Sequence, residues 1–166
     1  MKQEDEDYFQ SDEFLDILNR YEQSVCTGRS PYMDSDELID VADYYMSQGK
    51  HKEAIKATEL ALELHPDAED PVTMMADIMF ETQQWKEAIV WLNRVLDNDP
   101  FDVQAWLNMT DSQLQCDLFA EALDSAEYTL AIQPDNLQAM VQKGYALSRQ
   151  ERYAEACEVF GQYLER

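Results

Sequence analysis

Aspartate recurs at positions 43, 77 and 111, so a constant interval of 34 residues separates three carboxylates. A constant interval places equal charges at equivalent points of a repeated structure, and negative charge attracts lysine and arginine side chains. The chemistry that this spacing predicts is recognition of a basic segment of another protein. The alternative is a set of solvated charges that only keep a helix surface wet.

Other residues that can perform chemistry lack the spacing that it requires. His51 and His65 belong to no zinc-protease, phosphate-loop or serine-hydrolase motif. Cys26, Cys116 and Cys157 are distant from one another and odd in number, which argues against a disulfide framework or a zinc site. The sequence therefore predicts no enzyme and no cofactor. Cys116 and Cys157 are expected to act as small apolar residues in a reducing compartment such as the cytoplasm.

Two acid-rich turns, 34–40 and 97–102, invite comparison with calcium-binding loops. Their carboxylates alternate, but neither turn has a glycine at the sixth position or a glutamate at the twelfth. An EF-hand loop requires both residues. We therefore expect no metal site in either turn.

The composition is that of a soluble globular chain, with 45% apolar and 28% charged residues. The formal net charge of −23 argues against nucleic acid or an anionic membrane as a partner, because both need a cationic surface. No stretch approaches the roughly 18 apolar residues of a membrane span, and the N-terminus lacks the apolar core of a secretory signal. Residues 1–10 are predicted to form a disordered acidic leader.

The chain repeats itself every 34 residues from position 35 onward. In the first repeat, Asp34 and Glu37 form a predicted capping box, and a helix then runs to a stop at Gln48 and Gly49. A second helix follows and ends before Pro66. The markers that recur at this interval are prolines and Glu-Ala pairs: Pro66, Pro100 and Pro134; Glu53-Ala54, Glu87-Ala88, Glu121-Ala122 and Glu155-Ala156. The repeated glutamates predict an interaction with the N-terminus of each second helix.

Each repeat also carries a bulky, a small and a ring-bearing residue at fixed places. These positions are Leu38, Val72, Trp106 and Met140; Ala42, Ala76, Thr110 and Gly144; and His51, Trp85, Phe119 and Tyr153. With the Glu-Ala pair and the closing proline, this pattern resembles the tetratricopeptide repeat family. Gln113, Thr58 and Ala126 depart from the family pattern. The resemblance implies an all-α fold, a right-handed solenoid of helical hairpins with repeats 35–68, 69–102, 103–136 and 137–166.

Residues 11–34 read as a capping helix and a turn. Ser11 is the predicted N-cap, Gly28 lies past the end, and the helix does not continue the repeat. Such a helix would cover the apolar flank of the first repeat, as arrays require. Its expected apolar face comprises Phe14, Ile17, Leu18, Tyr21 and Val25. The segment resembles the leaders of bacterial repeat proteins.

In the tetratricopeptide family, the first helices of successive repeats line a concave groove that holds peptides. The resemblance therefore implies a groove lined by Asp40, Asp43, Met74, Asp77, Asn108, Asp111, Gln142 and Tyr145. Some members grip a C-terminal carboxylate with lysine and arginine in this groove. Here Ile39, Gln104 and Gln142 stand at those places, so that function is rejected.

The leading functional hypothesis is a non-enzymatic module that binds a basic or polar peptide in an acidic groove. Two alternatives remain open. The apolar residues of the last helix, such as Val159 and Phe160, predict a homodimer through an uncovered C-terminal face. The chain is otherwise the regulatory repeat array of a longer protein.

Overall fold

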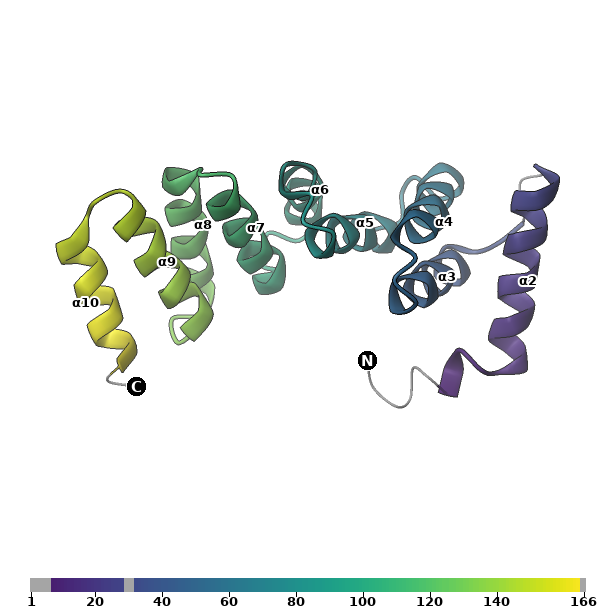
Figure 1. Ribbon diagram of the computed structural model, residues 1–166, viewed down its shortest axis with the longest axis horizontal. Coiled ribbons are helices and arrows are strands. Elements are labelled where there is room, and N and C mark those ends of the chain that lie inside the picture. The colour runs from purple at the N-terminus through teal and green to yellow at the C-terminus, as the bar shows by residue number, and fades with distance from the viewer. Residues whose placement is uncertain (1–6, 29–31, 165–166) are drawn as a thin grey trace. The chain divides into compact units, whose positions relative to one another are not determined.

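The segments with helical spacing of apolar residues form helices in the computed structural model, which describes residues 7–28 and 32–164 (Figure 1). Within those two ranges, all regular secondary structure is helical. The helices are α2 (Asp12–Thr27), α3 (Ser35–Ser47), α4 (His51–Leu64), α5 (Asp70–Glu81), α6 (Trp85–Asn98), α7 (Val103–Gln115), α8 (Phe119–Ile132), α9 (Leu137–Arg149) and α10 (Tyr153–Leu164). Each of the four predicted repeat ranges holds two of them.

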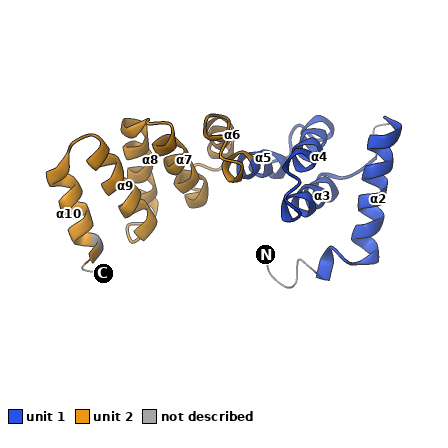
Figure 2. Cartoon of the chain, in the orientation of Figure 1, with its two compact units in different colours: residues 1–78 blue, residues 79–166 orange. Residues whose placement is uncertain are grey.

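The chain divides into two compact units, residues 1–78 and residues 79–166, which Figure 2 colours separately. Unit 1 comprises α2, α3, α4 and most of α5. Unit 2 comprises the last residues of α5 and the helices α6 to α10. The division falls inside α5 and not between two predicted repeats. Each unit contains a hydrophobic cluster of its own.

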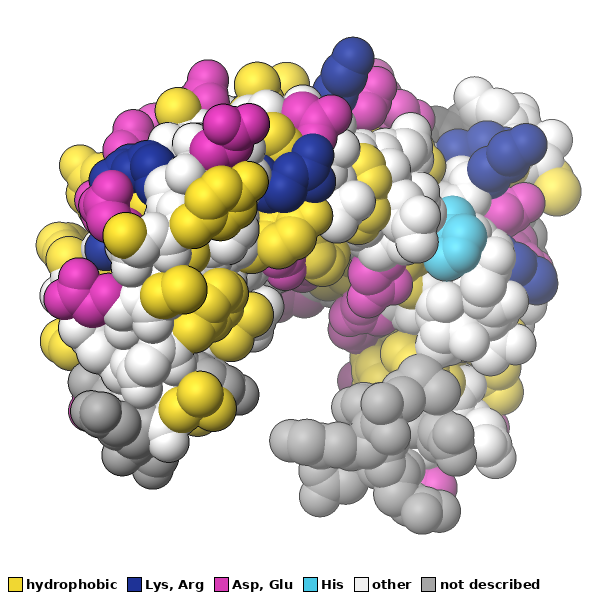
Figure 3. Space-filling model, turned by 60° about the vertical axis from the view of Figure 1, so that its left-hand side comes forward, with side chains coloured by type: hydrophobic (Ala, Val, Ile, Leu, Met, Phe, Trp, Pro, Cys, Tyr) yellow, Lys and Arg dark blue, Asp and Glu magenta, His cyan; other side chains and the backbone are white. Residues whose placement is uncertain are grey.

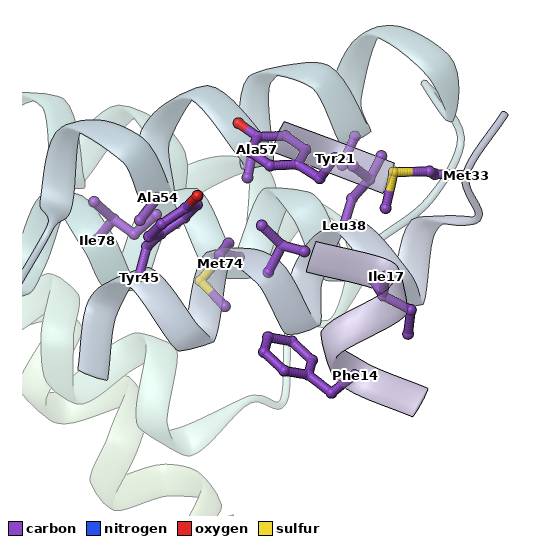
Figure 4. Close-up of a cluster of buried hydrophobic side chains, with 13 residues drawn as sticks. Phe14, Ile17, Tyr21, Met33, Leu38, Tyr45, Ala54, Ala57, Met74 and Ile78 are labelled. Atoms are coloured by element: carbon purple, nitrogen blue, oxygen red, sulfur yellow. The ribbon is translucent and has the colours of Figure 1, made fainter. Parts of the chain in front are cut away.

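The core of unit 1 is built from α2 and the first helical hairpin (Figure 4). Phe14, Ile17 and Tyr21 of α2 are buried beside Leu38 of α3, as the sequence pattern predicts. Ser11 caps α2 by accepting a hydrogen bond from the Phe14 backbone at 3.1 Å. α2 therefore packs on the first repeat with the predicted face, which excludes water from that side of α3.

Two details of this N-terminal region differ from expectation. Val25, an expected core residue, is 56% exposed, and it lines a cavity between α2 and the first hairpin. Tyr8 and Phe9 pack against the core, and the Phe9 ring lies 4.9 Å from the Phe14 ring. The expected disordered leader therefore does not extend over them, because aromatic burial orders this segment. Residues 1–6 lie outside the described part of the chain.

The helices of each pair are joined by a turn that contains one left-handed residue. Four residues separated by the repeat interval have φ between +59° and +68°: Gly49, Gln83, Asp117 and Glu151. The next residue then donates to a carbonyl five positions earlier, as Lys50 does to Tyr45 at 2.8 Å. This bonding terminates a helix in the Schellman manner. The predicted stop at Gln48 and Gly49 is confirmed, since α3 ends at Ser47.

The first helices α3, α7 and α9 begin with a side chain that caps the backbone. Asp34 and Glu37 form the predicted capping box of α3. Asp102 accepts from the Ala105 backbone at 3.0 Å, and Asn136 accepts from the Ala139 backbone at 2.9 Å. These bonds satisfy N–H groups that a helix N-terminus otherwise leaves unpaired.

The second helices α4, α6 and α8 begin without such a bond. Their N-cap residues are Lys50, Gln84 and Leu118, whose side chains make no cap hydrogen bond. Each helix instead carries the glutamate of its Glu-Ala pair in the first turn, and α10 does the same. The predicted placement of these glutamates is confirmed, and a carboxylate there is stabilised by the helix dipole.

Unit 2 packs its hairpins through small residues. Thr110 is fully buried, and its hydroxyl donates a hydrogen bond to the Trp106 carbonyl at 2.8 Å. Gly144 of α9 lies against the Phe160 ring of α10, with no room for a side chain between them. Gln113, which replaces a family aromatic residue, accepts a hydrogen bond from Ser125 at 2.8 Å and so joins α7 to α8 by a polar contact.

Three findings bear on the excluded chemistries. In residues 7–28 and 32–164, no helix is both long and apolar enough to span a bilayer, and no three metal-ligating side chains gather at one place. The cysteines are free thiols. Cys157 is exposed, so the expected role as a small packed residue is wrong for it, because it faces away from the α9 contact.

Candidate protein-binding surface

The first helices of unit 2 bring together three of the predicted groove residues. Gln142 of α9 donates from Nε2 to the Asp111 carboxylate of α7 at 2.7 Å and to the Leu107 carbonyl at 3.1 Å. One turn before Asp111, Asn108 accepts a hydrogen bond from Gln104 at 2.9 Å. Acid and amide side chains from two consecutive repeats thus form one polar cluster, which comprises Gln104, Asn108, Asp111, Gln138 and Gln142.

Asp111 is the charged centre of this polar cluster. Burial raises the pKa of its carboxyl, while hydrogen bonds from Gln142 and Gln138 act in the opposite direction by stabilising the carboxylate. Since the pKa stays raised overall, the carboxylate has lost more hydration than its two amide donors replace. A cationic group from a partner would supply the missing stabilisation.

Gln142 has a second unusual feature. Its side chain is only 5% exposed, and its Oε1 atom is buried without a hydrogen-bond partner among the described residues. A buried amide oxygen without a donor costs free energy. The half-buried Asp111 carboxylate is therefore the acceptor that the polar cluster offers to an approaching donor, whereas the Gln142 oxygen is enclosed by the protein.

The predicted groove residues of unit 1 have a different environment. Asp43 and Asp77 are exposed side chains on α3 and α5. Asp40 accepts a hydrogen bond from the Tyr8 hydroxyl, so the N-terminal segment covers it. Burial and this bond to Asp40 raise the pKa of Tyr8 to about 12, which keeps the hydroxyl a donor at neutral pH. Met74 does not fit the predicted groove, because its side chain lies in the core of unit 1 and cannot contact a ligand unless that core unpacks.

Tyr145 lies near the end of α9 and is 46% exposed. Its hydroxyl accepts a hydrogen bond from Arg149 at 3.0 Å, and the same guanidinium lies 3.4 Å from the Asp117 carboxylate. Arg149 also covers the Phe119 ring at 4.5 Å from its centroid. Arg149 therefore adds a positive charge at this end of unit 2, which the sequence analysis did not predict. Its position four residues after Tyr145 places the two side chains on one side of the helix.

Exposed apolar side chains share α9 with the polar cluster. Leu137, Val141 and Tyr145 recur every four residues and are 48%, 42% and 46% exposed. Residues four apart lie on one side of a helix, so these three form a stripe beside Gln142. On the face drawn in Figure 3, acidic side chains are spread over the surface with hydrophobic ones between them. Such mixed surfaces are typical of protein interfaces.

The structure thus gathers some of the predicted residues and separates others. Asn108, Asp111 and Gln142 lie together in unit 2, whereas Asp43 and Asp77 belong to unit 1. The hydrogen bond from Tyr8 to Asp40 was not predicted, because an aromatic residue 32 positions earlier does not belong to the repeat pattern. The two amides next to Asp111 were visible in the sequence as groove-facing glutamines, but their bonds to it were not.

Helical pairs with small residues at their contact, recurrent left-handed turns and polar first helices define a repeat protein of the interaction type. Tetratricopeptide repeat models match residues 45–110 and 138–166, which together are more than half of the chain. The chain belongs to the tetratricopeptide repeat family. The prediction of this family from the 34-residue pattern is thereby confirmed.

Solved structures of MamA have a similar fold. One from strain AMB-1 is 20% identical, with a TM-score of 0.77, and the match covers 95% of this chain and 89% of that one. MamA residues 41 to the end from Desulfovibrio magneticus RS-1 are 15% identical, with a TM-score of 0.76 and coverage of 93% and 95%. No curated protein sequence matches the chain.

These likenesses confirm the predicted fold class, an all-α array of tetratricopeptide hairpins. At such low identity, the likeness to MamA extends to the fold alone. The family supports a general role as a protein–protein interaction or scaffold module. The identity of the bound segment and the residues that bind it require separate arguments.

Proposed function

We propose that the protein is a non-enzymatic adaptor that binds a lysine- or arginine-rich segment of a partner through its first helices. The observation that carries this proposal is the environment of Asp111. Its carboxylate is half-buried, its pKa is raised by burial, and amides from the next repeat hold it in place. Keeping a charge there costs stability, and such a cost is typical of a residue retained for binding.

Other side chains of the first helices favour a basic and partly apolar segment. Asp43 and Asp77 add exposed negative charge at the equivalent positions of earlier repeats. Val141, which is 42% exposed on α9, offers an apolar contact. A net charge of −23 also increases the rate at which a basic partner arrives.

Binding of fluorescent peptides to a triple variant, Asp43→Asn, Asp77→Asn and Asp111→Asn, tests this proposal. We expect affinity for a lysine- and arginine-rich peptide to fall about three- to hundredfold, given roughly 0.2–1 kcal/mol for each exposed charge pair. Affinity of the wild type should also fall as salt rises, because exposed pairs are screened.

The matched control neutralises three exposed acids on second helices, Glu59→Gln, Asp97→Asn and Asp124→Asn. It changes the net charge by the same amount and should leave affinity nearly unchanged. An equal loss of affinity in both triple variants would mean that the overall charge of the protein, and not these three aspartates, determines binding. Tighter binding of an acidic peptide than of the basic one would exclude the proposal.

A second candidate function is self-association through α10. Tyr153 and Leu164 of this helix are 62% and 81% exposed, so both apolar side chains are accessible to a second copy of the chain. Sedimentation over a wide concentration range should then show a dimer that Leu164→Ser and Tyr153→Ser weaken. A monomer at every concentration would remove this candidate.

A further inference from the structure

Unit 1 contains a cavity of about 210 Å³ where the end of α2 meets the first hairpin. It lies away from the first-helix residues discussed above. Cavities for whole small molecules usually measure about 300–1,000 Å³, so this one is suited to a single side chain. The lining residues used below are Tyr21, Glu22 and Val25 of α2, Tyr45 of α3, and Glu53 and Lys56 of α4.

The Tyr21 hydroxyl is the most informative group in this cavity. The side chain is only 3% exposed, yet its hydroxyl has no hydrogen-bond partner in the described part of the chain. Burial and the nearby Glu53 charge raise the pKa of Tyr21, so the hydroxyl is neutral at physiological pH. In Figure 4 the Tyr21 and Tyr45 hydroxyls both point away from Phe14 and Ile17. A hydroxyl that lines the cavity without a protein partner can form a hydrogen bond with a ligand there.

The charges around the cavity favour a cation. Glu22 accepts a hydrogen bond from the Tyr45 hydroxyl at 3.2 Å. Neither Glu22 nor Glu53 forms an ion pair with a cation of the described residues, although Lys56 also lines the cavity. Two carboxylates against one ammonium leave the site with a negative excess, which disfavours an anionic ligand.

The aromatic and apolar walls add to this preference. Lys50 lies 5.6 Å from the centroid of the Tyr45 ring, so one face of that ring already attracts a cation of the chain itself. Val25, which the sequence pattern assigns to the core, is 56% exposed at the cavity and offers an apolar surface to a methylene chain. The combination fits a cationic head on an apolar stem.

We infer that this cavity binds one arginine side chain of a partner protein. A guanidinium has five donors in a planar fork, so it can reach both carboxylates and the Tyr21 oxygen while its plane stacks on a tyrosine. An ammonium has fewer donors and stacks less well. The inference does not depend on the proposed function, because no lining residue belongs to the first-helix set Asp43, Asp77 and Asp111.

The test is a titration of the isotope-labelled protein with acetyl-Gly-Arg-Gly-amide, followed by NMR chemical shifts. The shifts should be confined to residues of α2, α3 and α4 around the cavity. The citrulline version of the peptide, which has the same shape without the charge, should bind at least several-fold more weakly. The lysine version should also bind less tightly than arginine.

Two variants assign the contact. Tyr21→Phe and Glu53→Gln should each weaken binding about two- to tenfold, which is the range expected for loss of one hydrogen bond. Since the Tyr21 hydroxyl has no partner, Tyr21→Phe should unfold at nearly the same temperature as the wild type. If it unfolds much earlier, Glu53→Gln, which removes only charge from a first-turn side chain, decides the result.

Glu59→Gln is the matched control, because Glu59 is an exposed glutamate of the same helix that does not line the cavity. It should bind like the wild type. Equal binding of the arginine and citrulline peptides, shifts outside this region of unit 1, or an equal loss in Glu59→Gln would overturn the inference. Failure of the triple aspartate test would leave it standing, so the two proposals fail separately.

Discussion

Gln142 of α9 holds Asp111 of α7 through a 2.7 Å hydrogen bond, although 31 positions separate the two residues in the sequence. The contact joins consecutive repeats of unit 2. It fixes the carboxylate in a half-buried place where burial raises its pKa. Asp111 is therefore the member of the predicted aspartate set whose pKa is raised by burial.

Asp111→Asn should raise the thermal stability of the protein at pH 7. A carboxyl whose pKa is raised by folding stabilises the native state at low pH, and this contribution is lost as pH rises through the native pKa. The amide keeps an oxygen for Gln142 but has no charge to desolvate. Unfolding followed by circular dichroism should show an advantage at pH 7 that shrinks toward pH 3.

Asp77→Asn controls for the removal of one charge from a very acidic chain, because Asp77 is exposed. The stabilisation by Asp111→Asn should exceed that of the control at pH 7. A variant less stable than this control would show that the charged form of Asp111 is the favoured one in the folded protein.

Gly144→Ala should destabilise the contact between α9 and α10. A Cβ atom at this position would lie 2.5 Å from Cε1 and Cζ of Phe160, and contacts this short force a shift of the ring. We expect a loss of roughly 1–3 kcal/mol from overpacking, although alanine favours helices by about 1 kcal/mol over glycine. Chemical denaturation measures the difference in unfolding free energy.

Gly161→Ala is a control on α10, because an added Cβ there meets no atom within 4 Å. It should stabilise the protein by about the helix-propensity difference. Phe160→Leu should recover part of the loss in the Gly144→Ala background. If Gly144→Ala is as stable as Gly161→Ala, the steric explanation of this glycine is incorrect.

The left-handed residues of the turns predict opposite effects for glycine and alanine. Gln83→Gly and Glu151→Gly should each increase stability by roughly 1 kcal/mol, since both side chains occupy a conformation that costs about 1–2 kcal/mol outside glycine. Gly49→Ala should decrease stability by a similar amount. Differential scanning calorimetry of the three single variants is sufficient, and a gain from Gly49→Ala would contradict this account.

The ion pair of Arg20 and Glu37 should make docking of α2 sensitive to acid. Arg20 Nη2 lies 2.5 Å from the Glu37 carboxylate, and this bond lowers the pKa of Glu37. A lowered pKa gives stability that is present above the unfolded-state value and lost as pH falls through the native value. Arg20→Met should cost about 0.2–1 kcal/mol at pH 7, because the pair is partly exposed, and less at pH 3.

Arg152→Met provides the comparison for this pair. The ion pair of Arg152 is with Glu155, three residues later, so this pair does not join two helices. Its replacement should leave the unfolding midpoint unchanged. Equal losses from the two arginine variants would mean that the Arg20 pair does not hold α2 against α3.

Periodic features of the fold were predictable from the sequence, because the same types of residue recur at equivalent positions of each repeat. The small residues Ala42, Ala76 and Thr110 are buried, and the capping box at Asp34 forms as expected. The left-handed turn was readable only at Gly49. In the later repeats the helix ends also adopt that conformation, and Gln83 and Glu151 have no preference for it.

The candidate site was less predictable, because its properties arise between repeats. The hydrogen bond that Gln142 of the following repeat donates to Asp111 is a contact between side chains of two repeats, which the 34-residue pattern does not predict. The spacing of Met74 predicts a surface residue, but its side chain is buried in the core of unit 1. Tyr8 reaches Asp40 through packing of an aromatic segment that carries no repeat signal.

All three tryptophans of the chain, Trp85, Trp91 and Trp106, belong to unit 2. Their indole emission therefore follows melting of residues 79–166 only, whereas far-ultraviolet ellipticity follows both halves of the molecule. Superimposable denaturation curves from the two optical signals would mean that the halves unfold in one cooperative step. Curves that separate would give each half its own free energy of unfolding without any label or truncation.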